Sequence, residues 1–415
     1  MEARATFRRF LEQKYRKAFG SEGWNPLAAG LLIGFVNVVS YVWVGKAFTV
    51  YTGFLNWGQH LYNLLGLGSV AGVPKLSPLL EPTSVGDIGA ILGAFLAASL
   101  SGEFAIRKPG GWVDVLENIC GGLLMALGVA LAFGCNWGGF LSAITSWSLH
   151  GFAFFAGALA GGYLGLRYVA WRAERVASRL ALTIQQVEAL ARTSGSGSGR
   201  EHGCCTLLFN SRLTPPVLAA AALALLLAHY AALGSSMAGG LLVGVMVGVI
   251  LQRARFCFAT AFRDLFNGPE NARAINIHKG IVVAVLSGSI GVFALKFTGV
   301  VKEGAGVAPV YVTNVLGGLI FTFGSILAGG CASGLLWRTG EGHVKAWIAM
   351  LTTVLAYPLL YNALRPLVAG YPAIFLPRSI GWVPAFAAMV AFAALYAALL
   401  YYLEFRYGAR GRMQQ

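Results

Sequence analysis

Ten long apolar stretches limit the fold of this chain more than any other feature. Each approaches or exceeds the roughly 18 to 20 residues that an α-helix needs to cross the hydrocarbon core of a bilayer. Inside that core the chain must satisfy its own backbone groups, so only helices or a closed barrel can cross it. The stretches are continuous rather than alternating, which favours helices. The predicted crossings are roughly 26–48, 86–104, 117–134 (running on to 148), 150–170, 213–233, 236–252, 277–298, 312–330, 344–364 and 381–403.

The basic residues follow the loops between these crossings. The net charge of +15 is compatible with nucleic-acid binding, but only 11% of the residues are charged, against roughly a quarter in an average soluble domain. If the chain starts inside the cell, 25 of its 31 Lys and Arg residues fall in cytoplasmic segments. We therefore predict a multi-pass protein of the cell membrane with both termini in the cytoplasm, and no nucleic-acid partner.

The sequence contains an internal repeat. Shifting it by 196 residues superimposes 118–138 on 314–334, with ten of twenty-one positions identical. A weaker match at a shift of 210 pairs "AAGLLIGF" at 28–35 with "AGGLLVGV" at 238–245. The chain is therefore predicted to hold two copies of one structural unit.

The number of crossings predicts how the copies are related. Each copy holds four crossings and one extra crossing lies between them, so the second copy is inverted relative to the first. In transporters, such inverted repeats place the binding site where the copies meet near the bilayer midplane, often at broken helices. The fold class is thus an all-α polytopic membrane protein with two inverted repeats. The predicted segments are a basic cytoplasmic arm (1–25), the first repeat (26–170), a cytoplasmic linker (171–212), the inverting helix (213–235), the second repeat (236–364), and an external loop, final helix and cytoplasmic tail (365–415).

The linker combines three features. Residues 173–192 place apolar side chains at helical spacing on one face, which predicts a surface helix. A Gly/Ser tether, "SGSGSG", follows, and then "HGCCTL" with Cys204 and Cys205. No second cysteine pair completes a zinc site, so no metal is predicted there.

Two repeat-related cysteines are the leading candidates for function. Cys135 and Cys331 each follow a glycine, Gly134 and Gly330, at the end of an apolar stretch. The segments after them, "NWGGFLSAITSW" and "ASGLLWRT", are short and interrupted by glycine, as expected of half-helices that begin inside the membrane. A helix N-terminus offers free N–H groups to an anion. Asn136 adds a carboxamide beside the first thiol.

A third cysteine interrupts the sixth crossing. The segment "QRARFCFATAFRDLF" contains Arg255 and Cys257. Its counterpart in the first copy is "VWVGKAFTV", where Ala47 replaces the cysteine and Lys46 retains a nearby positive charge. Cys120 has Leu316 as its repeat partner and is predicted to be structural.

Neutral thiols suit a soft, mobile anion. A free thiol is mostly protonated at pH 7, and apolar surroundings favour that form further. It is a weak, polarizable donor that can contact a sulfur or selenium atom without holding it tightly. The alternative for each cysteine is that it serves as a small buried apolar side chain.

Charged groups near the cytoplasmic edge are candidate gate residues. "AFRDLF" contains Arg263 and Asp264, and "WRTGEGH" contains Arg338 and Glu341. They are predicted either to form an ion-pair gate or to be ordinary loop residues. Asp87 and Glu103 lie at segment ends, where an interfacial position is expected.

The three cysteine segments carry a family resemblance. "FGCNWGGFLSAITSWSLHGF", "RFCFATAFRDLF" and "LAGGCASGLLWRTGEGHV" resemble the YeeE/YedE family of sulfur-compound transporters, across most of the chain, and specifically its longer, selenium-associated branch. The resemblance implies an inverted-repeat membrane protein in which thiosulfate passes along cysteines by S–H···S contacts. The matching positions are Cys257, Cys135 and Cys331. It also implies a cytosolic sulfur carrier of the TusA type as partner, with Cys204 and Cys205 as a possible docking point.

The sequence thus predicts a non-enzymatic carrier, without metal or cofactor, that imports a small sulfur anion, thiosulfate first. Three alternatives stay open: a selenium-compound transporter, a transmembrane thiol-disulfide electron conduit, and a membrane scaffold for sulfurtransferases. The predicted path residues are Gly134, Cys135, Asn136, Arg255, Cys257, Gly330 and Cys331, and the candidate gate residues are Arg263, Asp264, Arg338 and Glu341.

Overall fold

The structure is a computed structural model that describes residues 23–74, 76–191, 214–268, 272–368 and 370–413. Within them the chain is helical, with isolated β-bridges and no strand. The first repeat contains α2 (Pro26–Val44), α3 (Val50–Leu64), α4 (Gly68–Ala71), α5 (Pro82–Leu100), α6 (Trp112–Ala132), the π-helix η1 (Asn136–Ser142), α7 (Ala143–Thr145) and α8 (His150–Ala191). The inverting helix is α9 (Thr214–Leu233). The second repeat contains α10 (Ser235–Ala254), α11 (Phe258–Asp264), α12 (Ala272–Phe297), α13 (Val312–Leu327), α14 (Ala332–Gly340) and α15 (Val344–Val368), and α16 (Leu376–Ile380) and α17 (Trp382–Met413) follow.

Among the described residues, ten segments are long and apolar enough to cross a membrane. Three of them, 112–145, 235–264 and 312–340, join a long helix to a short one. This agrees with the predicted all-α polytopic fold with two repeats and broken helices. The amphipathic segment predicted at 173–192 is not a separate helix, because α8 continues through it to Ala191.

Helix contacts show the two copies as exchanged partners. Helix α2 packs against α12, and its counterpart α10 packs against α5. In the same way α6 packs against α15, and α13 packs against α8. In these four pairs, each helix packs against a helix of the other copy. Four crossings precede α9, the fifth, so the second copy enters the membrane in the inverted orientation.

The same backbone break occurs in both copies. Asn25 caps α2 by accepting a hydrogen bond from the Leu27 N–H (2.8 Å), and Pro26 occupies the first turn, where its missing donor costs nothing. Helix α2 ends at Gly45 with φ +79°, and α10 ends at Arg255 with φ +52°. Arg255 thus occupies a left-handed conformation that glycine adopts more easily. These turns redirect the chain into the short helices α3 and α11.

Helices α6 and α13 form a close seam between the copies. A methyl group on Gly121 would lie 2.5 Å from the Ala328 nitrogen, and one on Gly128 would lie 2.5 Å from the Phe321 nitrogen. Such small residues allow helix backbones to approach closely in a membrane. The two helices run antiparallel, so α6 ends beside the start of α13, where Asn314 Nδ2 donates to the Ala132 oxygen (3.3 Å).

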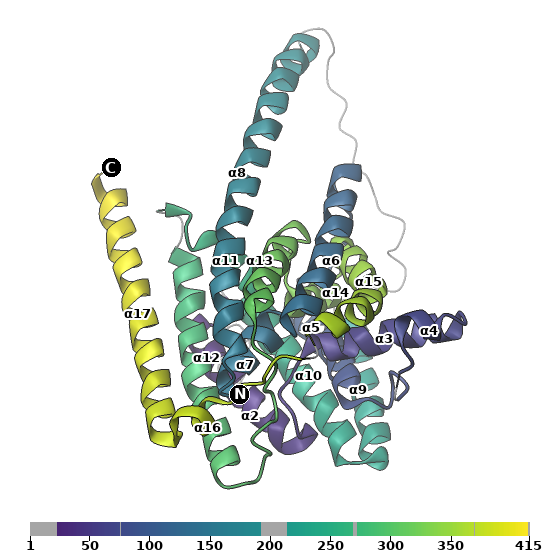
Figure 1. The fold of residues 1–415 in the computed structure, drawn as a ribbon. Helices are drawn as coiled ribbons and strands as arrows, with labels where there is room; N and C mark the ends of the chain where they lie inside the picture. Colours follow the sequence, from purple (N-terminus) through teal and green to yellow (C-terminus); the bar gives the residue numbers. More distant parts are fainter. Residues whose placement is uncertain (1–22, 75, 192–213, 269–271, 369, 414–415) are drawn as a thin grey trace, which may run out of the picture.

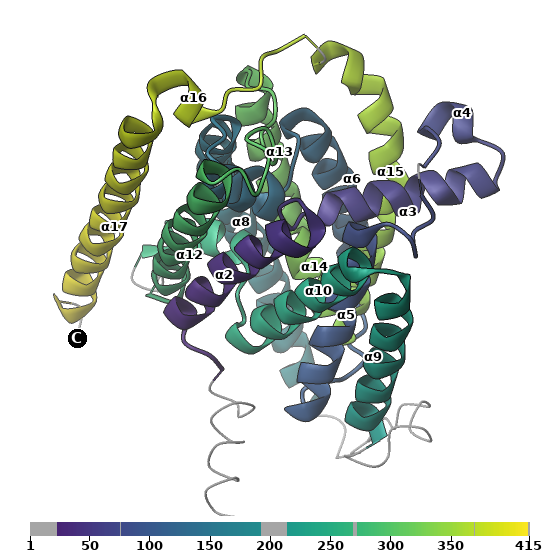
Figure 2. The same cartoon turned by 90° about the horizontal axis from the view of Figure 1, so that it is seen from below.

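Some elements extend from this core. Figure 1 shows α8 projecting well beyond the other helices, and the C-terminal end of α17 pointing to the same side. Figure 2 shows α17 at one edge of the molecule, and α3 with α4 extending at the opposite edge. The basic arm, the Gly/Ser tether, Cys204 and Cys205 lie outside the described residues.

Candidate functional site

Three short helices begin directly after a cysteine. Cys135 is the N-cap of η1, Cys257 of α11 and Cys331 of α14. The Cys135 sulfur accepts a hydrogen bond from the Gly138 N–H (3.4 Å). Each of the three side chains is 1% exposed, and each is a free thiol. The chain therefore places three buried S–H groups at the breaks of its membrane segments, whereas Cys120 is exposed on α6.

The thiols of Cys257 and Cys331 are direct neighbours. A methyl group on Gly334 would lie 3.4 Å from both sulfur atoms, so the two thiols face the same small space. Gly334 thus leaves space beside both thiols. The Ser333 hydroxyl lies 3.5 Å from the Cys331 sulfur. Two cysteines separated by seventy-four positions in sequence share one small region.

Tyr51 on α3 lies near both Cys135 and Cys331. Its ring packs against Phe321 (5.7 Å between centroids) and Tyr357 (5.2 Å). Both Cys135 and Cys331 lie within electrostatic range of its hydroxyl. Sequence reasoning missed Tyr51, because a tyrosine in an apolar segment gives no signal that separates a path residue from a core residue.

The first-copy counterpart of Cys257 is Thr49, not Ala47 as the sequence comparison suggested. Helix α3 begins after Thr49, and Gly138 is the repeat partner of Gly334. A methyl group on Gly138 would lie 3.2 Å from Thr49 Cγ2, just as one on Gly334 would face the Cys257 sulfur. The short helix starts two residues later in the first copy than a fixed shift of 210 implies. A hydroxyl therefore stands where the second copy has a thiol.

A cavity of about 340 Å³ opens beside Cys257. Arg255 lies at its entrance and bridges two carboxylates, Glu341 (2.5 Å) and Glu103 (3.0 Å). We call this space the arginine cavity, and its lining residues are Arg255, Cys257, Thr260, Asp264, Arg273, Trp337, Arg338, Glu341 and His343.

Several buried donors at the site have no protein acceptor within the described part of the chain. They include Trp337 Nε1, Arg338 Nε and, beside Cys135, Asn136 Nδ2. The Trp337 ring also lies near two guanidinium groups, with Arg338 Cζ at 5.0 Å and Arg255 Cζ at 5.6 Å from its centroid. Buried donors normally find acceptors. These donors suit an anion, whereas Glu341 Oε2 in the same cavity is a buried acceptor that also has no hydrogen-bond partner among the described residues.

The titratable groups at the cavity rim are adjusted by burial and by neighbouring charge. Burial raises the pKa of Glu341 and outweighs the lowering effects of Gln252 and Arg255. For Glu103 burial acts in the same direction, but hydrogen bonds from Gln252 and Ser101 and the Arg255 charge lower its pKa overall. Burial and the Arg338 charge lower the pKa of His343 to about 4, so its imidazole is neutral at pH 7. The rim thus keeps its positive charge on guanidinium groups.

A family comparison agrees with this donor-rich, cysteine-containing site. A family model described as "Sulphur transport" matches residues 3–164 and again residues 253–414. The chain belongs to this sulphur transport family. One match falls in each half of the chain, and the second runs from the end of α10 through α17.

Named relatives of this sulphur transport protein fall into two groups. It is 28% identical over 402 residues to the "Probable transporter YedE" of Escherichia coli strain K12, with 94% of each chain covered. It is also 28% identical over 358 residues to the YedE protein of Salmonella typhimurium, covering 83% of this chain and 84% of that one. A shorter match, 39% over 118 residues, links it to the "Thiosulfate transporter TsuA" of Escherichia coli, covering 28% of this chain and 32% of that protein.

The four candidate gate residues do not form a single network of ion pairs. Asp264, Arg338 and Glu341 line the arginine cavity, but the carboxylate of Glu341 is bound by Arg255. Arg263 pairs with its neighbour Asp264 (2.5 and 2.8 Å) and borders a separate small pocket. Three of the four predicted gate residues are therefore brought together, and the ion pair that spans helices uses Arg255 instead.

The two predicted glycines have different surroundings. A methyl group on Gly134 would lie 2.3 Å from the Gly139 nitrogen, so this turn requires glycine. A methyl group on Gly330 would lie 3.4 to 3.6 Å from Gly334 and the Arg338 side chain, which is ordinary contact. Gly134 therefore shapes the turn into η1, whereas Gly330 leaves room for the Arg338 side chain.

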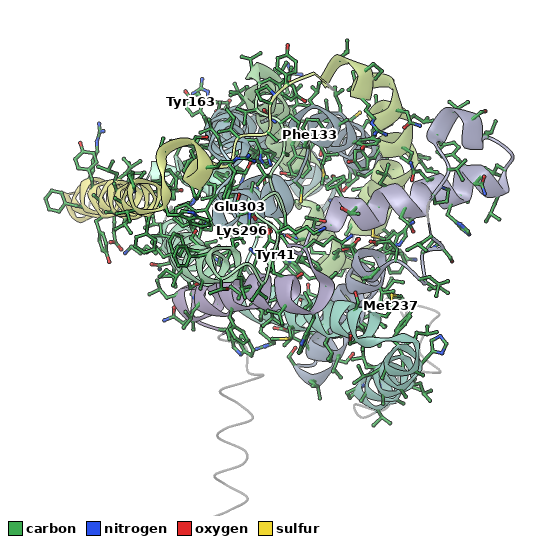
Figure 3. The ribbon with its side chains drawn as sticks, turned by 60° about the horizontal axis from the view of Figure 1, so that its bottom comes forward. Tyr41, Phe133, Tyr163, Met237, Lys296 and Glu303 are labelled. Atoms are coloured by element: carbon green, nitrogen blue, oxygen red, sulfur yellow. The ribbon has the colours of Figure 1, made fainter. Side chains whose placement is uncertain are left out.

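The opposite end of the site, beside α7, is closed. Lys296 is 3% exposed and donates to the backbone oxygens of Ser146 (2.9 Å), Glu303 (2.7 Å) and Ala305 (2.8 Å). The Tyr41 hydroxyl bonds to the Ser146 hydroxyl and to the Ala305 oxygen (3.2 Å). Figure 3 labels Tyr41, Lys296 and Glu303, which lie close together. The loop between α12 and α13 is thereby fixed over the end of α7.

Proposed function

We propose that this protein imports a small sulfur oxyanion, with thiosulfate the first candidate, through the region bounded by Cys135, Cys257 and Cys331. Membership of the sulphur transport family and the named thiosulfate transporters among its relatives support this assignment. The observation that carries the proposal is that the Cys257 and Cys331 thiols both face the space left by Gly334, beside a cavity where Trp337 Nε1 and Arg338 Nε have no acceptor among the described residues.

Each group has a separate role in this proposal. The guanidinium groups of Arg255 and Arg338 attract the anion and replace part of its hydration shell. The thiols contact its terminal sulfur as weak donors, so that each contact is favourable but easily exchanged. Asn136 and Trp337 offer donors to its oxygen atoms. No bond within the anion forms or breaks.

The proposed orientation places the arginine cavity on the cytoplasmic side of the cell membrane. The excess of Lys and Arg in the segments assigned to the cytoplasm supports it, and both termini are then cytoplasmic. The cavity becomes the exit and the closed end beside α7 becomes the entrance. A cytosolic sulfur carrier of the TusA type is the proposed recipient of the anion.

Uptake measurements test the substrate. Purified protein in proteoliposomes would be supplied with labelled thiosulfate, sulfate or selenite, with Cys120→Ala as a matched cysteine control. We expect thiosulfate uptake that Cys331→Ala and Cys257→Ala lower by about tenfold or more and that Cys120→Ala leaves unchanged. Faster selenite uptake would favour the selenium alternative, and normal thiosulfate uptake in both buried-cysteine variants would contradict the proposed path.

The closeness of the Cys257 and Cys331 thiols also favours one alternative function, a thiol-disulfide electron conduit. A conduit requires Cys257 and Cys331 to cycle between thiols and a disulfide, so a Ser substitution at either position would abolish function. The proposed carrier needs only a small donor and should retain part of its uptake with Ser. Complete loss in Cys257→Ser and Cys331→Ser, together with a redox-dependent disulfide between the two cysteines in the wild-type chain, would support the conduit.

A further inference from the structure

Asp87 is a buried acid inside the membrane that the path described above does not use. It is the sixth residue of α5 and is 0% exposed, so it is packed inside the protein, and the interfacial position expected from the sequence stays a prediction. Within the described residues, neither carboxylate oxygen has a hydrogen-bond partner. An ionisable side chain at such a position is costly to keep, and it commonly marks an ion or proton pathway.

The neighbouring helices leave room for this carboxyl group, and in the part of the chain that the structure describes no basic side chain pairs with it. A methyl group on Gly53 of α3 would lie 2.1 Å from Asp87 Oδ2, so the carboxyl group fills the space that Gly53 leaves open. Helix α10 faces this part of α5 with Gly240 and Gly244. Glu81, at the start of α5, is already paired with Lys46 (2.9 Å).

The other titratable groups around Asp87 are neutral side chains or thiols. Tyr51 comes from α3, and Tyr230 from α9 shares an apolar cluster with Val85. Cys135 lies within electrostatic range of the carboxyl group. A negative charge on Asp87 is therefore felt at one of the proposed path thiols.

The repeat shows that helix packing alone does not require an acid here. Gly244 packs on the Gly86 backbone, and its repeat partner Gly34 packs near the Ala284 backbone. One residue further along each helix, Asp87 in the first copy corresponds to Val285 in the second, which is also buried. An apolar side chain fills this place in one copy and a carboxyl group fills it in the other.

We propose that Asp87 binds a proton that enters together with the sulfur anion. This proposal depends on the function proposed above. An ionised carboxylate without partners is strongly disfavoured in a low-dielectric interior. Asp87 is therefore neutral and protonated in this arrangement, in which the end beside α7 is closed. A divalent anion that enters a negatively charged cell interior moves against the membrane potential, and a proton that enters with it offsets one of its two charges.

Electrostatic repulsion links proton binding at Asp87 to the arrival of the anion beside Cys135. An anion beside Cys135 repels a carboxylate at Asp87 and so favours its protonation, and by reciprocity a protonated Asp87 favours the anion. The carboxylate takes one proton from the outer side as the anion reaches Cys135, and it releases that proton inward after the anion has left. The charge of the anion and its covalent structure do not change.

The test measures proton and anion movement in the same proteoliposomes. Labelled thiosulfate reports uptake and an internal pH-sensitive dye reports proton entry, for the wild-type chain, Asp87→Asn, Asp87→Glu and the control Glu404→Gln. Glu404 is a half-exposed acid on α17 that pairs with Lys279, so its substitution should change neither signal. For Asp87→Asn we expect net uptake driven by an acidic exterior to fall by about tenfold or more, a typical size for a coupling between two sites.

A measurement of thiosulfate exchange distinguishes a role of Asp87 in proton coupling from a purely structural role. Asp87→Asn mimics the protonated acid, so exchange of internal for external thiosulfate should continue while thiosulfate-driven proton entry disappears. Asp87→Glu should restore proton entry at a shifted pH dependence. Normal proton entry in Asp87→Asn would overturn the proposal, and so would loss of exchange together with net uptake in a variant that remains folded by size-exclusion chromatography. Failure of the wild-type chain to transport thiosulfate would instead contradict the proposed substrate, and the same comparison with selenite would then decide the role of Asp87.

Discussion

The two ends of the proposed path are built from repeat-related elements but differ in their contents. Beside α14, guanidinium groups surround an open cavity of about 340 Å³ next to Cys257. Beside α7, the corresponding end is filled by Tyr41 and by Lys296 bound to three carbonyl oxygens. Gly306 has φ +75°, and a side chain there would meet the Tyr41 hydroxyl at 2.3 Å, so the closing loop fits tightly. The duplicated scaffold positions both ends, and local side chains decide which one is open.

The largest expected effect concerns the thiol that both copies share. Cys331→Ala removes a buried S–H donor from the proposed path, and we expect thiosulfate uptake to fall by about tenfold to a hundredfold, the range for losing a hydrogen bond to a charged partner. Cys331→Ser keeps a small donor and should retain intermediate uptake. The measurement is initial uptake in proteoliposomes, and equal rates for Cys331→Ala and wild type would contradict the comparison.

The closed end provides the second test. Lys296→Met removes all three hydrogen bonds that fix the loop, so we expect Cys135 to react about tenfold faster with a membrane-impermeant maleimide added from outside. Lys302→Met changes an exposed lysine on the same loop and is the matched control. Mass spectrometry of the Cys135 peptide gives the rates. Unchanged labelling in Lys296→Met would show that Lys296 does not keep this end closed.

Trp337→Phe sharpens the assignment of the open end to anion binding. It keeps an aromatic ring beside Arg255 and Arg338 but removes the buried Nε1 donor that lacks an acceptor. The loss of one neutral hydrogen bond should raise the KM for thiosulfate about threefold to tenfold and leave the maximal rate near that of the wild type. A lower rate with unchanged KM would assign this donor to a later step than binding.

The smallest effect is expected at Glu341. Burial raises its pKa, so its negative charge is lost as the pH falls through that raised value, and the cavity becomes more attractive to an anion. Glu341→Gln imitates the protonated acid and should lower the KM by about twofold at pH 7.5, because a single partly screened charge has a small effect. Measured at pH 7.5 and 5.5, the difference in KM between the two proteins should shrink at the lower pH. A constant difference would contradict the raised pKa.

The sequence predicted the parts of this molecule that depend on local pattern. Apolar length predicted the crossings, and the repeated "GC" motifs predicted where helices break and which cysteines cap the next ones. It did not predict the neighbours of those cysteines, because Tyr51, Thr49 and Asp87 come from other elements and are positioned only by packing. Thr49 shows this clearly, since a two-residue difference in a turn moved the equivalent position away from Ala47.

The seam between α6 and α13 limits how the closed end can open. At Gly121 and Gly128 the two backbones are too close for even one added carbon atom. Such tight packing resists rotation of one copy against the other. We therefore expect traffic through the membrane to depend on small rearrangements at the cysteine-capped ends and the covering loop, while the two halves keep a constant separation.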